Sequence, residues 1–407
     1  MIIGIPTEIK TGEKRIAMSP TNVQSLTDRS IKVLIQENSG SAAGYPDGEY
    51  IAAGAKIITD RTEIFASADI ILQVQSFGSN NENSELDLAL LRSGQLVIGM
   101  MDPLASPQAA QTVAATGASA IALELVPRIS RAQSMDVLSS MATLSGYKAV
   151  LIGASASPRI FPMLMTAAGT LQPARVLIMG VGVAGLQACA TAKRLGAIVE
   201  AYDVRPAARE QIISVGAKPV ELDLDTGESE GAGGYAKAQG EDFLRRQREL
   251  MTAVVAEQDI IITTAAIPGA KSPILVTEDM VIAMKPGAVI VDLAAERGGN
   301  CDLTEQGKTV VAHDVTIVGP ENVPSDLAYH ASQMYGKNMQ TLLELILDEN
   351  GDLNLDFSDE IVAGTVVAHK GDVPHAHMRK LLGLTEIKAS VEPKQQAPAP
   401  VAPTDKK

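Results

Sequence analysis

Residues 175–205, RVLIMGVGVAGLQACATAKRLGAIVEAYDVR, decide the fold of this chain. The apolar run 175–179 predicts a buried strand, and an amphipathic pattern after it predicts a helix that Gly196 ends. A second apolar run, 198–202, predicts another strand. Strand, glycine-rich turn, helix and strand in this order are typical of a βαβ unit with parallel strands.

The spacing of three glycines and one acid indicates what this turn binds. Gly180 permits a tight turn, Gly182 lets the backbone approach a pyrophosphate, and Gly185 lets helix and strand pack closely. Asp203 stands where the fingerprint has an acid that bonds the adenosine ribose hydroxyls and repels a 2′-phosphate. The pattern therefore predicts an NAD site; Arg205 weakens the preference over NADP slightly, and a turn without a ligand is the alternative. The predicted contacts here are Gly180, Val181, Gly182, Val183, Gly185, Asp203, Val204 and Arg205.

Composition narrows the class of protein. Of the 407 residues 46% are hydrophobic and 20% charged, and aromatic residues make up only 3%, so aliphatic cores are expected. The net charge of -14 argues against nucleic acid or anionic lipid as a direct partner. Cys189 and Cys301 form no disulfide framework, which predicts a reducing compartment. We expect no signal peptide and no membrane insertion.

Two series of short apolar runs alternate with helical patterns. The runs of the first series cover 2–6, 32–37, 68–75, 95–101 and 119–125. Those of the second cover 174–180, 198–204, 218–222, 259–265, 287–293 and 315–319. This alternation predicts an α/β protein with two Rossmann-like, doubly wound parallel-sheet lobes and a cleft between them.

A helical pattern at 137–170 lies between the two series, and another at 325–349 follows the second series; together they predict two connections between the lobes. We therefore expect a discontinuous N-terminal lobe and an NAD(H)-binding lobe, followed by a disordered tail rich in Pro and Ala. Their expected limits are 1–138 with 325–384, 139–324, and 385–407. A Gly- and acid-rich stretch at 223–240 is long for a connection and predicts a mobile loop.

The usual acid–base groups are missing from most of the chain. No histidine precedes His313, and His375 and His377 fit a surface loop better than a metal site, so no metal is predicted. The stretch RISRAQSMD, 128–136, has arginine, serine, glutamine and aspartate but no His, Cys or Lys. A solvated helix start, capped by Ser134 or Asp136, is the plain interpretation of this stretch.

Several segments together carry a family resemblance. They are GIPTEIKTGEKRIAMSP (4–20), PRISRAQSMDVLSS (127–140), GVGVAGLQA (180–188), AYDVRP (201–206), GGYAK (233–237), TTAAIPG (263–269) and VIVDLAAERGGNC (289–301). Over about residues 1–384 the chain resembles the NAD(H)-binding domain of proton-translocating nicotinamide nucleotide transhydrogenases. In bacterial three-subunit enzymes this domain is a separate soluble chain, the first part of the alpha subunit. RAQSMD and GGYAK are quite specific to that family.

The resemblance implies direct hydride transfer between NADH on this chain and NADP⁺ on a partner, in an Si-specific, proton-translocating enzyme. No proton is exchanged with the substrate, so the site needs positioning groups rather than acids and bases. The implied catalytic residues are Arg128, Gln133, Asp136, Ser139 and Tyr235, the last on the loop that closes over the nucleotide. The implied cofactor contacts outside the glycine turn are Arg128, Ile129, Ser130, Gln133, Ser134, Met135, Asp136, Gly234, Gln247 and Ala266.

The resemblance also implies partners. We expect a homodimer, bound to a membrane-spanning companion alpha chain and to a beta subunit that carries NADP(H). The chain would then lie on the cytoplasmic side of the inner membrane, attached through these subunits.

Two alternatives stay open at this point. The opening segment also resembles alanine dehydrogenase, whose substrate-binding Lys and catalytic His are replaced here by LQVQSFG (72–78) and GMMDPLAS (99–106), although Arg15 remains. An alanine-dehydrogenase-like enzyme using Arg15 and another base is therefore one alternative. A non-enzymatic NAD sensor is the other.

Overall fold

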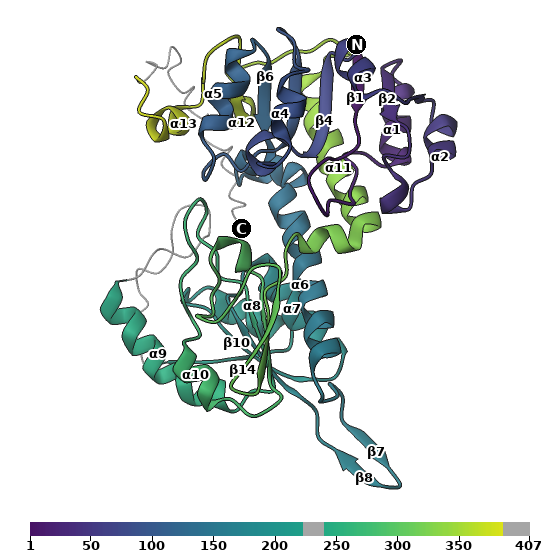
Figure 1. Cartoon of the computed structure of the whole chain (residues 1–407). Helices are drawn as coiled ribbons and strands as arrows, with labels where there is room; N and C mark the ends of the chain where they lie inside the picture. The colour runs from purple at the N-terminus through teal and green to yellow at the C-terminus, as the bar shows by residue number, and fades with distance from the viewer. Residues whose placement is uncertain (223–239, 386–407) are drawn as a thin grey trace, which may run out of the picture.

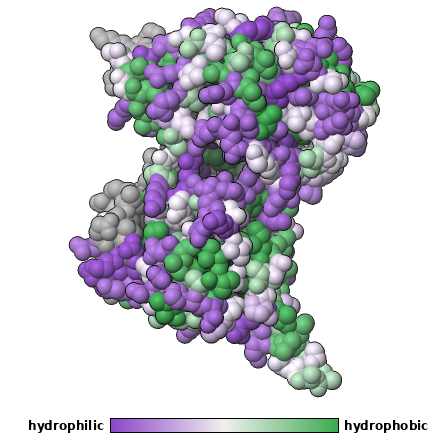
Figure 2. Space-filling view, viewed as in Figure 1, coloured by the Kyte–Doolittle hydropathy of each residue, from purple (hydrophilic) through white to green (hydrophobic). Residues whose placement is uncertain are grey.

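The chain folds into two lobes joined by long helices, as Figure 1 shows for a computed structural model that describes residues 1–222 and 240–385. Each lobe is built on a seven-stranded, mainly parallel sheet, which confirms the predicted fold class. Figure 2 shows the molecule hollowed between the lobes.

The N-terminal lobe contains a sheet of order β16-β6-β5-β4-β1-β2-β3. Its strands are β1 Ile2–Ile5, β2 Lys32–Gln36, β3 Lys56–Ile58, β4 Ile70–Gln75, β5 Leu96–Met100, β6 Ser119–Ala122 and β16 Val366–Ala368. Helices of this lobe are α1 Pro20–Thr27, α2 Asp47–Ala52, α3 Arg61–Ser67, α4 Ser84–Leu88, α5 Gln108–Ala115, α12 Glu360–Thr365 and α13 Ala376–Leu381. The antiparallel strand β16 brings the end of the described chain back to β6.

The second lobe has the order β11-β10-β9-β12-β13-β15-β14. Its strands are β9 Arg175–Met179, β10 Ile198–Tyr202, β11 Lys218–Pro219, β12 Ile260–Thr263, β13 Val289–Asp292, β14 Thr309–Ala312 and β15 Val315–Val318. Its helices are α7 Val183–Arg194, α8 Ala208–Ser214, α9 Glu241–Ala256 and α10 Glu278–Ala283. From β9 the strands continue through β10 and β11 on one side and through β12 and β13 on the other, so the strand order reverses at β9. Doubly wound sheets bind ligands at such a reversal, which is where the turn after β9 lies.

Two segments carry the chain between the lobes. Helix α6, Val137–Ala156, leads out of the N-terminal lobe, and a short helix, η7 Val323–Leu327, followed by α11, Ala328–Ile346, leads back. Met141 of α6 lies in the core of the N-terminal lobe, whereas Ala149 and Val150 lie in the core of the second lobe. By length and composition α6 could cross a membrane, but here it packs against α7, η7 and α11.

The predicted helical pattern over 137–170 is wrong beyond Ala156. Ser157 is extended because it precedes Pro158, and the chain then forms a hairpin of β7, Leu164–Thr166, and β8, Gly169–Leu171. The hairpin projects from the second lobe, and its apolar residues are therefore exposed (Figures 1 and 2). The short antiparallel edge strands β14 and β16 are also absent from the prediction.

Candidate functional site

The turn between β9 and α7 has the geometry that its glycines predict. Gly180 has a φ of +94°, and its carbonyl accepts a hydrogen bond from Thr264 Oγ1 at 2.8 Å. A Cβ on Gly185 would lie 2.0 Å from the Gly180 carbonyl oxygen, so only glycine allows α7 to start this close to the strand. The turn is therefore tight, and the helix begins directly above the strand end.

The N-terminus of α7 is open toward solvent. Gly182 is its N-cap, and no described side chain caps the helix there. A Cβ built on Gly182 would meet nothing within 4 Å. Uncapped N–H groups at the positive end of a helix, with free space in front of them, suit the pyrophosphate of a dinucleotide.

Asp203 lies beside this turn and is held in an ion pair. Its carboxylate accepts from the Val181 N–H at 2.7 Å and from Arg205 Nε and Nη2, each at 2.8 Å. Arg205 thus folds back onto Asp203 rather than projecting outward. The Arg205 N–H also donates to Oδ1, at 2.9 Å, so each carboxylate oxygen of Asp203 accepts two hydrogen bonds, and a ribose hydroxyl would bind Asp203 in place of one bond from Arg205. Val204 lies between them and is half-buried.

The polar stretch forms a short helix, η4 Ser130–Met135, fixed to the N-terminal lobe from both sides. Asn338 Nδ2 of α11 donates to the Ser134 carbonyl at 2.7 Å. Arg131 binds both oxygens of Asp359, at 2.7 and 2.8 Å, and this bidentate bond holds the pKa of Asp359 below its ordinary value. Buried between these anchors, Met135 points into the core, so its side chain is not exposed to the cleft.

Four of the predicted catalytic residues line one cavity of about 360 Å³. Its walls are Pro127, Arg128, Gln133, Asp136 and Ser139. Arg128, Ser130, Gln133 and Ser134 are exposed, and Ile129 is half-buried. No His, Lys or Cys is among the lining residues, so the cavity offers donors and acceptors rather than a mobile proton.

Asp136 does cap α6, as the plain interpretation of this stretch proposes. Its Oδ1 accepts from the Ser139 N–H at 2.9 Å and its Oδ2 from Ser139 Oγ at 2.6 Å. Both carboxylate oxygens of Asp136 therefore already accept hydrogen bonds from Ser139. The cap fixes the start of α6 at the cavity wall, where the amide of Gln133 is exposed.

The remaining predicted contacts are less concentrated. Ala266 is exposed in the loop after β12, at the same sheet edge as Gly180. Gln247 is only 3% exposed on α9, beside Tyr202, and its Nε2 has no hydrogen-bond partner among the described residues. Gly234 and Tyr235 lie outside the described residues, as do the rest of the predicted mobile loop up to residue 239 and the tail from 386 on.

A buried charged cluster that contacts α6 at Met141 is a feature that sequence reasoning missed. Arg15, 2% exposed, forms a bidentate ion pair with Glu13, with distances of 2.7 Å and 2.6 Å. Burial alone would raise the pKa of Glu13, but Arg15 lowers it to about 2. Burial and the Glu13 charge raise the pKa of the nearby Glu8 to about 8. Arg15 therefore has its fork occupied and cannot receive a substrate carboxylate as it stands.

The lobes also meet across the cleft. Asp102 Oδ1 accepts from Arg297 Nη2 at 2.5 Å, and a Cβ on Gly269 of the second lobe would lie 2.6 Å from the Cβ of Leu104. Asp102 occupies the segment that would carry the catalytic histidine of an alanine dehydrogenase. Behind it, Glu124 Oε1 accepts the Met101 and Asp102 N–H groups, and burial raises the pKa of Glu124 to about 7.

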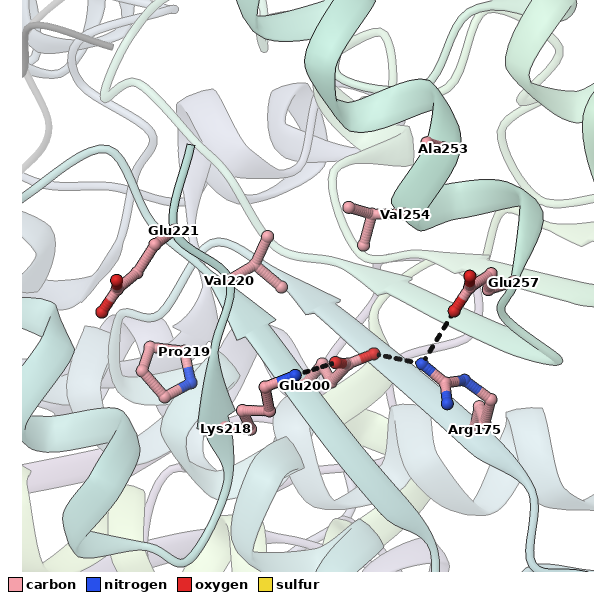
Figure 3. A pocket seen from close by; sticks show the side chains of 9 residues that line it. All are labelled: Arg175, Glu200, Lys218, Pro219, Val220, Glu221, Ala253, Val254 and Glu257. Atoms are coloured by element: carbon pink, nitrogen blue, oxygen red, sulfur yellow. Dashed lines mark hydrogen bonds and ion pairs between the residues drawn. The ribbon is translucent and has the colours of Figure 1, made fainter. Parts of the chain in front are cut away.

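A larger cavity of about 570 Å³ lies elsewhere in the second lobe. Figure 3 shows it between the edge strand β11 and α9, near Arg175, which begins β9 at the end opposite Gly180. Its charges satisfy one another: Arg175 binds Glu200 at 2.9 Å and Glu257 at 3.1 Å, and Lys218 binds Glu200 at 3.3 Å. With its charges paired, this cavity offers a ligand little. Among the described residues no cluster of three or more His, Cys, Asp or Glu is placed to hold a metal ion.

Two family models together match almost the whole described chain. Residues 4–145 match the N-terminal domain of alanine dehydrogenase/PNT, and residues 149–376 match its C-terminal domain.

The individual relatives include both transhydrogenase subunits and alanine dehydrogenases. The chain is 45% identical over 377 residues to the first part of NAD(P) transhydrogenase subunit alpha from Rhodospirillum rubrum, covering 92% of this chain and 98% of the relative. It is 30% identical over 336 residues to the alanine dehydrogenase of Mycolicibacterium smegmatis, covering 80% and 81%. A crystal structure of transhydrogenase from Sinorhizobium meliloti superposes with a TM-score of 0.80 at 41% identity, covering 93% of this chain and all of that one.

Proposed function

This chain belongs to the alanine dehydrogenase/PNT family and is more similar to the transhydrogenase relative than to the alanine dehydrogenase, and we propose that it is the NAD(H)-binding first section of the alpha subunit of a nicotinamide nucleotide transhydrogenase. In this role it presents NADH to NADP⁺ on a partner subunit for direct, Si-specific hydride transfer. The membrane subunits would couple that transfer to proton translocation.

The observation that carries the proposal is the cavity at the start of α6. Arg128, Gln133, Asp136 and Ser139 converge there, and none of its lining residues is a His, Lys or Cys. The one carboxylate, Asp136, already accepts both Ser139 donors. An enzyme that oxidises an alcohol or amine needs a group to take the proton, whereas a transhydrogenase needs only to hold two rings in position.

The residues present fit a dinucleotide. The uncapped start of α7 would bind the pyrophosphate, and Asp203 would bind the adenosine ribose, which favours NAD(H) over NADP(H). When bound, NADH supplies the hydride from its nicotinamide ring. Arg128 and Ser139 would orient that end of the cofactor, and the exposed amide of Gln133 would contact both the cofactor and the partner. Gly234 and Tyr235, which lie outside the described residues, are proposed as further contacts of the cofactor.

The proposed assembly is a homodimer bound to a membrane-spanning companion alpha chain and to an NADP(H)-binding beta subunit. The name of the R. rubrum relative, which describes one portion of an alpha subunit, supports companion chains. The β7–β8 hairpin supports the dimer, because Met163, Met165 and Leu171 are 54%, 81% and 50% exposed on an arm that needs a partner surface. The subunit would lie peripherally on the cytoplasmic side of the membrane.

The test mixes this chain with the soluble NADP(H)-binding domain of a transhydrogenase. NADPH is added together with the acetylpyridine analogue of NAD⁺, whose reduced form absorbs at a distinct wavelength. We expect exchange only when both proteins are present. Alanine-dependent reduction of NAD⁺ by this chain alone would instead support the alternative enzyme, and NADH binding without any exchange would support an NAD sensor.

A further inference from the structure

One buried guanidinium touches both segments that join the lobes. Arg15 Nη2 donates to Asn322 Oδ1 at 3.0 Å, on the connection that returns from the second lobe. Arg15 Nη1 donates to Met141 Sδ at 3.2 Å, on the outgoing helix α6. Since Arg15 belongs to the N-terminal lobe, a single side chain links that lobe to the outgoing and the returning chain.

Glu13 completes the link. Its Oε2 accepts from Asn322 Nδ2 at 3.0 Å and from Gln75 Nε2 at 3.3 Å, in addition to the two bonds from Arg15. The ion pair has side-chain exposures of 1% and 0%. A buried pair of charges is stable only while both partners and their hydrogen bonds stay in place, so it tolerates little displacement of the segments that contact it.

The returning chain is pinned at the same place by its backbone. Asn322 has a φ of +43°, in the left-handed region, immediately before η7. Ser325 Oγ accepts the Lys14 N–H at 2.8 Å, and Lys14 Nζ pairs with Asp326 at 3.0 Å. The loop around residues 12–15 thus holds the first turn of the return connection as well.

We infer that Arg15 and Glu13 are positioning residues that set the angle between the lobes, and thereby the placement of the nicotinamide cavity over the glycine turn. The inference rests on the proposed function for its consequence in hydride transfer. Met141 lies on the same helix as Ser139, which lines the cavity, so a shift at Arg15 moves that wall. Binding at α7 alone involves only the second lobe and does not depend on this angle.

This difference gives a readout that a merely structural role would not produce. NADH reaches from the turn at α7 to the cavity at α6, whereas ADP-ribose lacks the nicotinamide and occupies the second lobe alone. The variant Glu13→Gln/Arg15→Met removes both buried charges together and leaves neither unpaired. We expect its affinity for NADH to fall about tenfold and its affinity for ADP-ribose to stay within about twofold, measured by calorimetric titration of the full chain.

A matched control is available in the same lobe. Arg61 and Asp87 form a bidentate pair, at 2.7 Å for both bonds, with side-chain exposures of 16% and 4%. The other hydrogen-bond partners of these two side chains among the described residues are Thr7, Gln36 and Gln73, none of which belongs to α6 or the return connection. The variant Arg61→Met/Asp87→Asn should leave the ratio of the two affinities unchanged. Small-angle X-ray scattering without ligand should show a larger radius of gyration for the Glu13/Arg15 variant than for this control.

Asn322→Gly provides a second route if the double variant does not fold. It removes only the amide link, and glycine suits the positive φ there. We expect a smaller change in the same direction, about threefold in the affinity ratio. An unchanged ratio in both variants, or an equal change in the Arg61/Asp87 control, overturns the inference. Wild-type chain that binds no NADH, or supports no exchange, overturns the proposed function instead, and the scattering comparison still tests the interlobe link.

Discussion

Gly146 in the middle of α6 allows that helix to lie against the start of α7. A Cβ at this position would lie 2.0 Å from the carbonyl oxygen of Ala184 and 2.8 Å from its carbonyl carbon. Both obstacles are backbone atoms, so no side-chain rotation relieves the clash. In Gly146→Ala, therefore, the two helices must separate by at least roughly 1 Å to bring this contact to the shortest distance that a Cβ atom tolerates.

The separation has an energetic and a functional magnitude. Overpacking costs about 3 kcal/mol at the upper end of its usual range, and the better helix propensity of alanine returns about 1 kcal/mol. The net loss of about 2 kcal/mol lowers the melting temperature of the second lobe by about 4–8 °C. Because α6 carries Asp136 and Ser139 while α7 begins at the glycine turn, an error of about 1 Å between them should slow hydride exchange about 100-fold.

Gly153 in the same helix supplies the control. A Cβ there would lie 3.1 Å from Ile260 Cγ2 and 3.5 Å from Val291 Cγ2, both side-chain atoms that can adjust. Gly153→Ala should change the unfolding free energy by less than about 1 kcal/mol and leave exchange nearly intact. Differential scanning calorimetry and the acetylpyridine exchange assay measure both variants. If Gly146→Ala melts and exchanges like Gly153→Ala, the close approach of α6 to α7 does not position the site.

Three further outcomes follow from the geometry. Glu124 has a pKa of about 7 in the folded chain and 4.5 in the unfolded one, so its stabilising contribution is complete below pH 4.5 and is lost as the pH rises through 7. In urea unfolding, the wild type should therefore lose up to about 3 kcal/mol of unfolding free energy between pH 5 and pH 8 relative to Glu124→Gln. An equal change with pH in the two proteins contradicts this. Gln133→Asn, which shortens the exposed amide, should slow exchange at least about tenfold and change NADH affinity less than about twofold, whereas equal losses would count against a positioning role; Arg128→Ala should lower both. Met165 is 81% exposed, so Met165→Asp should shift the chain from dimer to monomer in analytical ultracentrifugation without destabilising the fold of the monomer, measured as its melting temperature. A wild-type chain that sediments as a monomer would contradict the proposed interface.

Much of the architecture is determined by local patterns in the sequence. Every apolar run predicted in the two series contains a strand, because a buried parallel strand needs a short continuous aliphatic segment whatever its neighbours are. The tight turn at Gly180 and the close packing at Gly185 follow likewise from residues adjacent in the chain. The absence of a histidine or lysine from the 128–136 stretch is also a property of the sequence alone, and it favours a positioning role for this stretch over acid–base chemistry.

The tertiary structure alone decided which distant segments meet. Val366 pairs with Ile121 to complete the first sheet, and the apolar residues of 163–171 form an exposed arm rather than a helix. In the sequence, Arg15 is only a residue shared with alanine dehydrogenase, whereas in the fold it binds Glu13, Asn322 and Met141. Periodicity and turn chemistry act over a few residues, whereas these contacts depend on how two completed lobes pack, so no local pattern encodes them.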